Sequence, residues 1–122
     1  MSDYRNLEVW QRAHRATLNI YNATEKFPKS EMFGLTSQMR RAALSIACNI
    51  VEGLGRHSDR ELVRFLRISI GSADELEYQL LVAKDLRYIT EVEHEKLQVE
   101  VKRVGRMLTS LASRVLARVS SG

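Results

Sequence analysis

The chain has 122 residues, of which 44% are hydrophobic and 28% are charged, proportions typical of one globular domain rather than a disordered segment. Its one cysteine excludes an internal disulfide framework and a multi-cysteine zinc site, and favours a reducing cytoplasm. No apolar run approaches the roughly 20 residues that span a bilayer, and the amino terminus does not resemble a secretion signal. We therefore predict a single cytoplasmic domain over residues 1–122, without membrane contact.

The basic excess is modest, with 19 basic against 15 acidic residues, a net charge of +4 and a pI near 9.5. Fourteen of the 19 basic residues are arginine, whose planar fork pairs with phosphate and carboxylate groups better than lysine does. This bias favours a polyanionic partner. Because arginine is also a good helix former, the composition alone leaves a purely structural interpretation open.

The first predicted helix covers residues 6–25, with Asn6 as its cap and apolar or small residues at alternating spacings of three and four. The only proline, Pro28, lies in the loop that follows, and this loop ends at Gly34. The second predicted helix covers residues 36–54 and ends near a pair of glycines. Both helices have the apolar stripe of a core-facing element.

Two capping boxes mark the later helices. Ser58 is followed three residues later by Glu61, and Thr90 is followed by Glu93 at the same spacing. After each box, apolar residues repeat every three or four positions, as in antiparallel bundles. The two helices are predicted over residues 58–87 and 90–118. Since short loops force successive helices to run antiparallel, we predict an all-α, up-down-up-down antiparallel four-helix bundle.

Two rows of cations lie opposite the apolar stripes of the last two helices. Outward helix positions are usually charged, so each row alone is consistent with a solvated face. Two rows on one small arginine-rich domain predict contact with nucleic acid or phosphate. The predicted nucleic-acid-binding residues are Arg56, Arg60, Arg64 and Arg67, followed by Lys102, Arg103, Arg106, Arg114 and Arg118.

A second set of residues predicts a subunit interface. The outer side of the second helix carries polar and apolar residues together, and the third helix carries an apolar strip beside its core stripe. The strip could also be an unusually wide core stripe. The predicted oligomer-interface residues are Arg41, Leu44, Ser45, Cys48, Asn49, Val51 and Glu52, together with Val63, Ile70 and Leu81.

The sequence contains no complete catalytic or metal-binding motif. One Glu-x-x-His pair occurs, Glu91 and His94, whereas a di-iron bundle needs two such pairs and two further inward glutamates. Cys48 has no local histidine base, which favours a small buried or interfacial residue over a nucleophile. The acidic run from Asp74 to Glu77 is typical of a solvated face. We therefore expect no enzyme activity, no catalytic residue, no cofactor and no metal.

The chain resembles a family of four-helix bundles encoded by intervening sequences within bacterial large-subunit ribosomal RNA genes. The resemblance covers about residues 4 to 118. Family members commonly carry alanine where Val51 stands and often proline near Ala47, and both differences leave the helix intact. The motifs that carry the resemblance are Leu7-Glu8-Val9-Trp10, Phe27-Pro28, Gly34-Leu35-Thr36-Ser37-Gln38, Arg40-Arg41-Ala42-Ala43, Ser45-Ile46, Asn49-Ile50, Glu52-Gly53 and Gly55-Arg56.

The resemblance implies a ring-shaped homo-oligomer, a homopentamer, with a basic surface, because family members and the related accessory variability determinants of diversity-generating retroelements look like such rings. Those determinants associate with a reverse transcriptase and with nucleic acid. Our leading hypothesis is a non-enzymatic oligomeric accessory protein that binds RNA or DNA. The alternatives are a protein–protein scaffold or adaptor that does not bind nucleic acid, and a metal- or phosphate-dependent enzyme.

Overall fold

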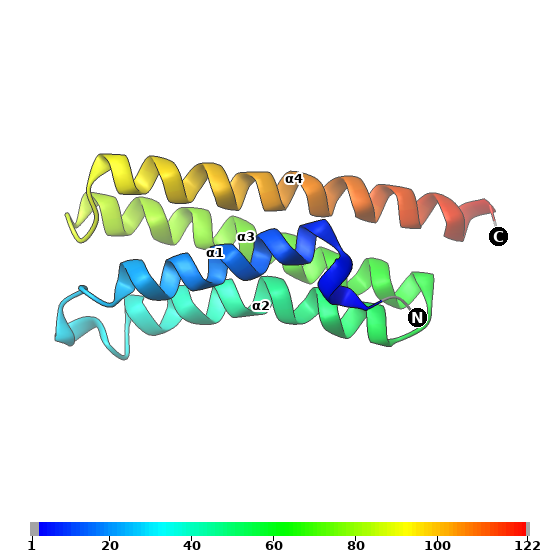
Figure 1. The fold of residues 1–122 in the computed structure, drawn as a ribbon, viewed down its shortest axis with the longest axis horizontal. Coiled ribbons are helices and arrows are strands. Elements are labelled where there is room, and N and C mark those ends of the chain that lie inside the picture. The colour runs from blue at the N-terminus through cyan, green and yellow to red at the C-terminus, as the bar shows by residue number, and fades with distance from the viewer. Residues whose placement is uncertain (1–2, 122) are drawn as a thin grey trace.

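In the computed structural model, which describes residues 3–121 and side chains through residue 119, helices make up almost the whole chain (Figure 1). Short 3-10 turns, Tyr4–Asn6 and Lys29–Glu31, precede the first two helices. No strand occurs within the described residues. The helices are α1 (Glu8–Thr24), α2 (Leu35–Gly55), α3 (Asp59–Asp85) and α4 (Glu91–Ser121).

Each helix packs against two neighbours around the perimeter of a bundle: α1 with α2, α2 with α3, α3 with α4, and α4 with α1. Both chain ends and the α2–α3 turn lie at one end of the molecule, and the other two connections lie at the opposite end (Figure 1). The prediction of an all-α, up-down-up-down antiparallel four-helix bundle is therefore confirmed. The structure is that of a single chain, so the expected ring stays a prediction.

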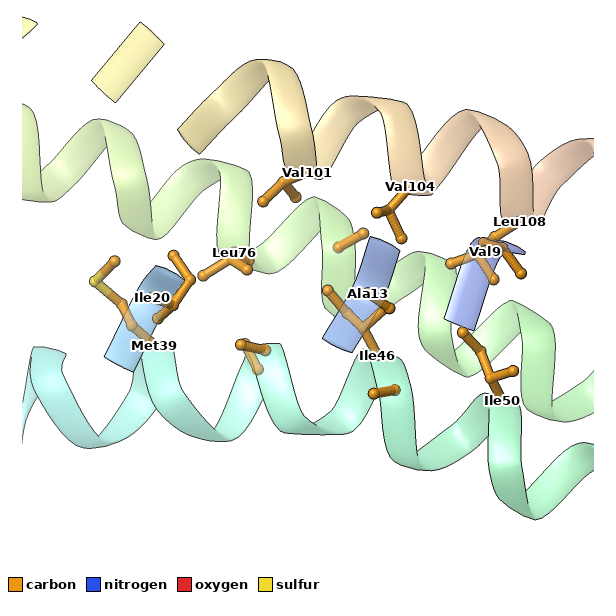
Figure 2. Close-up of a cluster of buried hydrophobic side chains, with 14 of the residues drawn as sticks. Val9, Ala13, Ile20, Met39, Ile46, Ile50, Leu76, Val101, Val104 and Leu108 are labelled. Atoms are coloured by element: carbon orange, nitrogen blue, oxygen red, sulfur yellow. The ribbon is translucent and has the colours of Figure 1, made fainter. Parts of the chain in front are cut away.

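The core is built from the apolar stripes of all four helices. Figure 2 shows side chains of α1, α2, α3 and α4, among them Ile20, Met39, Leu76 and Val101, converging on the bundle axis. These four side chains are at most 1% exposed. Burying a side chain of this size stabilises the fold by about 1.5–3 kcal/mol, so the stripes are the main source of stability.

The start of α1 differs from the expected cap. Asn6 does not cap the helix but belongs to the 3-10 turn, where its amide donates to the backbone carbonyl of Asp3 at 3.1 Å. The Asp3 side chain caps this turn by accepting from the Arg5 amide at 3.0 Å. Helix α1 then begins at Glu8, after Leu7 in an extended conformation. The side chain that caps the start of the chain is therefore Asp3, upstream of the expected residue.

The two capping boxes lie at the starts of α3 and α4 as expected, but only the box at α4 has both of its hydrogen bonds. The Glu93 amide donates to Thr90 Oγ1 at 3.1 Å, and the Thr90 amide donates to Glu93 Oε1 at 2.9 Å, which closes the box. At Ser58 only the first half forms, with the Glu61 amide donating to Ser58 Oγ at 3.3 Å. The Glu93 carboxylate also pairs with Lys26, so it ties the start of α4 to the segment that follows α1.

The α2–α3 turn depends on one close approach and one left-handed residue. A Cβ atom added to Gly53 would lie 2.9 Å from Phe65 Cβ and 3.0 Å from Leu62 Cδ1. His57, rather than either glycine, supplies the left-handed backbone of the turn, with φ of 56°. Gly53 is therefore required for helix packing, while Gly55 has no atom near its missing Cβ.

Gly53→Ala should destabilise the fold by about 1–3 kcal/mol, because the new methyl group overlaps the first turns of α3. For a domain of this size we expect the Tm to fall by roughly 4 °C per kcal/mol. The matched control is Gly55→Ala, which should leave stability unchanged or raise it by up to about 1 kcal/mol. Thermal unfolding followed by circular dichroism measures both, and equal effects of the two substitutions would contradict this packing.

Glu93 should make stability depend on pH in the acid range. Its hydrogen bonds from Lys26 and from the Thr90 amide hold the pKa of Glu93 below its usual value of 4.5. The stabilisation is therefore complete above the unfolded-state pKa and is lost as pH falls through the lower folded-state pKa. Glu93→Gln should lower the Tm at about pH 7, and the gap to the wild type should close toward about pH 2. Glu95→Gln, two residues along, is the control, and a gap independent of pH would exclude this mechanism.

Candidate nucleic-acid interface

All nine cations predicted to bind nucleic acid have exposed side chains. Four of them lie at the end of α2 and along the first half of α3, and five lie on α4. Their outward direction follows from the helical spacing, which places them opposite the buried apolar stripes. These cations fall into groups that differ in the side chains they contact.

Two arginines beside the α2–α3 turn are held over one aromatic ring. The guanidinium carbon of Arg64 lies 4.4 Å from the centre of the Phe65 ring, and that of Arg56 lies 5.2 Å from it. Arg56 also pairs with Glu52 at 2.9 Å, and Arg64 pairs with Glu61 at 3.1 Å. The hydrogen bond to Glu61 raises the pKa of Arg64 above its usual value. Both guanidinium groups are thus positioned and permanently charged.

Arg118 links the end of α4 to the start of α3. Its guanidinium pairs with Asp59 at 3.2 Å, and this hydrogen bond lowers the pKa of Asp59. By contrast, Arg60 and Arg67 form no ion pair with any side chain of the described residues. The start of α3 therefore presents two arginines without an acidic partner beside the two that are held over Phe65.

The α4 cations do not form the single row that the sequence predicted. Lys102 pairs with Glu77 of α3 at 3.7 Å and lines a hollow on the α3 side together with Arg106. Arg103 instead lines a hollow on the α1 side. Consecutive positions on a helix differ by about 100°, so the wide predicted row is divided between the two flanks of α4.

Hydrogen bonds between helices show which residues of different helices lie at the same position along the bundle axis. The one hydroxyl hydrogen of Thr17 is shared between the carbonyl of Ala13 in its own helix, at 2.8 Å, and that of Ala43 in α2, at 3.2 Å. Ser69 Oγ donates to the Ile46 carbonyl at 2.8 Å. Asn19 Nδ2 donates to Glu100 Oε1 at 3.1 Å. A plane halfway along the bundle therefore crosses the helices close to positions 15, 45, 70 and 105.

The net charge lies entirely on one side of this plane. The half that holds both termini and the α2–α3 turn contains nine basic and five acidic residues, and we call it the basic half. The other half contains ten of each, so it is balanced. The basic half comprises residues 3–14, 46–70 and 106–121 (Figure 1). All four cations predicted around the start of α3 belong to it, as do three of the five predicted on α4.

The hollow on the α1 side of α4 joins Arg103 with three basic residues that were not among the predicted nucleic-acid-binding residues. Arg12, Arg15, Lys96 and Arg103 line it, and its volume is about 190 Å³. Arg12 and Arg15 are three positions apart on α1, and Lys96 and Arg103 are seven positions apart on α4, so each pair shares a helix face. That spacing was visible in the sequence, but the adjacency of α1 and α4 was needed to join the pairs.

The predicted interface residues fall into three places rather than one surface. On the outer side of α2, Leu44 is 41% exposed, Arg41 and Cys48 are exposed, and Val51 is half-buried. Cys48 is therefore not a buried residue of the protomer. The neighbouring face of α1 adds Leu18, which is 56% exposed, and Tyr21, neither of which was predicted to lie at an interface.

Three polar residues of the predicted interface are engaged within the protomer. Ser45 Oγ lies 2.8 Å from Ser72 Oγ in the seam between α2 and α3. Asn49 Nδ2 donates to the Ser45 carbonyl at 2.8 Å and to Ser45 Oγ at 3.0 Å. Glu52 pairs with Arg56 one turn further along its own helix. These three residues, predicted to contact a neighbouring subunit, therefore already have hydrogen-bond or ion-pair partners within the protomer.

The apolar strip predicted on α3 is also divided. Val63 is 4% exposed and belongs to the core, so its assignment to an exposed strip was wrong. Ile70 is half-buried against the core and faces α4, where it lines the same hollow as Lys102. Leu81 is exposed. A wide core stripe therefore explains Val63, because the long α4 covers this side of α3.

The described part of the chain offers no evident metal site and no membrane span. No group of three or more His, Cys, Asp or Glu side chains there could hold a metal ion. His94 is 8% exposed, and its Nε2 has no hydrogen-bond partner among the described residues. None of the helices within residues 3–121 is both long enough and apolar enough to cross a membrane.

Similarity to known proteins agrees with this architecture. Among solved structures, a protein of unknown function from the S23 ribosomal protein family of Bacteroides thetaiotaomicron is similar, with a TM-score of 0.79 and 24% identity over 86% of this chain and 95% of that one. At this identity the likeness shows the shared helical fold. No curated protein matches the chain. The family model described as 23S rRNA-intervening sequence protein matches residues 5–110, most of the chain. The chain therefore belongs to the 23S rRNA-intervening sequence protein family.

Proposed function

We propose that the protein is a non-enzymatic accessory protein that binds RNA or DNA through its basic half and works as a ring-shaped homo-oligomer, with a pentamer as the expected size. The observation that carries the proposal is the concentration of the whole positive charge excess in one half of the bundle. A localised basic surface attracts polyanions over distances near the Debye length, which is about 8 Å in physiological salt.

Preorganised arginines strengthen this proposal. Ordering a long side chain on binding costs about 0.5–1.5 kcal/mol, and the stacking of Arg56 and Arg64 on Phe65 meets part of that cost in the free protein. A guanidinium group has five N–H donors, and Arg64 directs its Nε and Nη2 groups to Glu61, which leaves others for a phosphate. Exposed ion pairs contribute only about 0–1 kcal/mol, so the acidic partners compete weakly.

Arg60→Gln and Arg67→Gln should weaken RNA and DNA binding, because each removes an exposed guanidinium group without breaking an ion pair. For each phosphate interaction removed, the log-log dependence of affinity on salt should become shallower by roughly 0.7 with a single strand and 0.9 with a duplex. Fluorescence anisotropy with labelled single-stranded RNA and duplex DNA between roughly 50 and 200 mM salt, the range over which phosphate binding weakens strongly, measures this.

The control is Lys29→Gln, which removes one exposed charge in the other half of the bundle. It should leave the salt dependence unchanged. Wild-type protein that shows no salt-sensitive binding at micromolar concentration would contradict the proposal. That outcome would favour the protein scaffold, for which the structure offers Phe33, 92% exposed at the end of the α1–α2 connection. A protein partner, such as a reverse transcriptase, would then be the expected ligand.

The proposed subunit interface is the outer face shared by α1 and α2. Leu18 and Leu44 each stand one position beyond the Thr17–Ala43 hydrogen bond on their helices, so they lie across the same helix pair. Both are exposed, as is Tyr21, and exposed apolar surfaces of this kind mark contact sites. The proposed interface keeps Leu44 and its neighbours on the outer side of α2 from the sequence prediction. It adds residues of α1 and leaves out those of α3.

Leu44→Glu should shift the protein from an oligomer toward the monomer mass of 14.0 kDa, because a carboxylate buried at an apolar interface loses its hydration. Light scattering coupled to size exclusion measures the mass. Val92→Glu changes another exposed apolar residue, on α4, and is expected to leave the oligomer intact. A wild-type protein that is monomeric at micromolar concentration would rule out the interface.

A further inference from the structure

The hollow between the outer sides of α1 and α4 collects cations from two helices. Arg12 and Arg15 come from α1, and Lys96 and Arg103 come from α4; Val99 and Glu100 complete the lining. The position of the hollow is fixed by the hydrogen bonds from Asn19 of α1 to both carboxylate oxygens of Glu100, at 3.1 and 3.2 Å. It lies on the flank of α4 that faces α1 rather than α3, so it is a different surface from the arginines at the start of α3.

The positive charge of this hollow is poorly compensated. Arg12 pairs with Glu8 at 3.3 Å. Arg15, Lys96 and Arg103 form no ion pair with any side chain of the described residues. Glu100 is the one acidic residue of the lining, and its carboxylate accepts from Asn19 rather than from a cation. Four cations against one carboxylate leave the lining at +3, or +2 when Glu8 is included.

Like charges held at the rim of one concave site repel one another, and the repulsion is relieved by an anion bound between them. The hollow of about 190 Å³ is smaller than the roughly 300–1,000 Å³ of sites that enclose a drug-sized ligand. It has room for a small anionic group and not for a whole nucleotide. Arginine forks favour the flat, bidentate contacts that phosphate oxygens offer.

We propose that this hollow binds a terminal phosphate group, that is, a phosphomonoester. A phosphomonoester carries about −1.5 to −2 charges at pH 7, which matches the uncompensated charge of the lining better than the single charge of a backbone phosphodiester. The ester can belong to a free metabolite or to the 5′ end of a nucleic-acid strand. In both cases the phosphate enters the hollow and the rest of the ligand stays outside.

The site is independent of the proposed function, because it uses another flank of α4 and residues of α1. Affinities are compared for two RNA oligonucleotides of identical sequence, one with a 5′-phosphate and one with a 5′-hydroxyl. The difference reports binding of the terminal group, because the backbone is the same in both. The wild-type protein should bind the phosphorylated strand roughly tenfold more tightly, a ratio equal to about 1.4 kcal/mol. Ribose 5-phosphate, with ribose as the neutral control, tests the free ester by thermal shift, and a rise of about 6 °C is expected at ten times its Kd.

Arg15→Gln and Arg103→Gln should abolish the preference for the phosphorylated strand and the ribose 5-phosphate shift. Both side chains are exposed, so the fold should be retained, which circular dichroism verifies. Glu100→Gln should act in the opposite direction and raise the preference about twofold to fivefold, since it removes the one negative charge of the lining. Lys29→Gln is the charge-matched control and should change neither measurement.

Arg60→Gln should weaken binding of both oligonucleotides by the same factor. The test of the basic half and the test of the hollow therefore give distinguishable results. A thermal shift without preference for the 5′-phosphate would assign the hollow to a free ester and still support the site. Equal affinity for the two strands together with no shift by ribose 5-phosphate would overturn the proposal. An unchanged preference or shift in Arg15→Gln would overturn it as well.

Discussion

The arrangement of the bundle depends on how closely α2 approaches its two neighbours. A threonine of α1 and a serine of α3 each reach a backbone carbonyl of α2, through Thr17 to Ala43 and Ser69 to Ile46. Hydroxyls on such short side chains reach another helix only when the backbones lie close together. The alanines of α2 and the missing Cβ of Gly53 allow that approach. Small residues on α2 therefore determine how α1, α2 and α3 are positioned along the bundle axis relative to one another.

These relative positions determine which charges become neighbours. The helices are amphipathic on their own, but a one-turn slip of α4 along α1 would shift Lys96 and Arg103 by about 5.4 Å relative to the α1 arginines. The hydrogen bonds of Asn19 with Glu100 oppose that slip, as does the ion pair that Glu93 forms beyond the end of α1. The basic half and the α1–α4 hollow are therefore properties of the packed bundle, not of any single helix.

The sequence was sufficient to predict the fold, because its signals are local. The apolar periods identify four helices, and the box formed by Thr90 and Glu93 marks the start of α4 to within one residue. It was insufficient wherever a residue's role depends on its neighbours. Asn6 is a good cap in isolation, but Asp3 forms a turn upstream of it. Val63 sits at the margin of its helical stripe, and its burial becomes visible only once the helices are packed.

The same limit applies to the candidate sites. A helical wheel shows that Lys102 and Arg103 both point outward, but not that one meets Glu77 of α3 and the other lines the hollow beside α1. From Arg103 to Arg118 the helix rises about 22 Å, at 1.5 Å per residue. At roughly 3.4 Å per nucleotide, a strand whose 5′-phosphate occupied the hollow would reach Arg118 after about six or seven nucleotides. The α4 residues of the hollow and the α4 cations of the basic half therefore lie along one helix, at a spacing that one nucleic-acid strand can bridge.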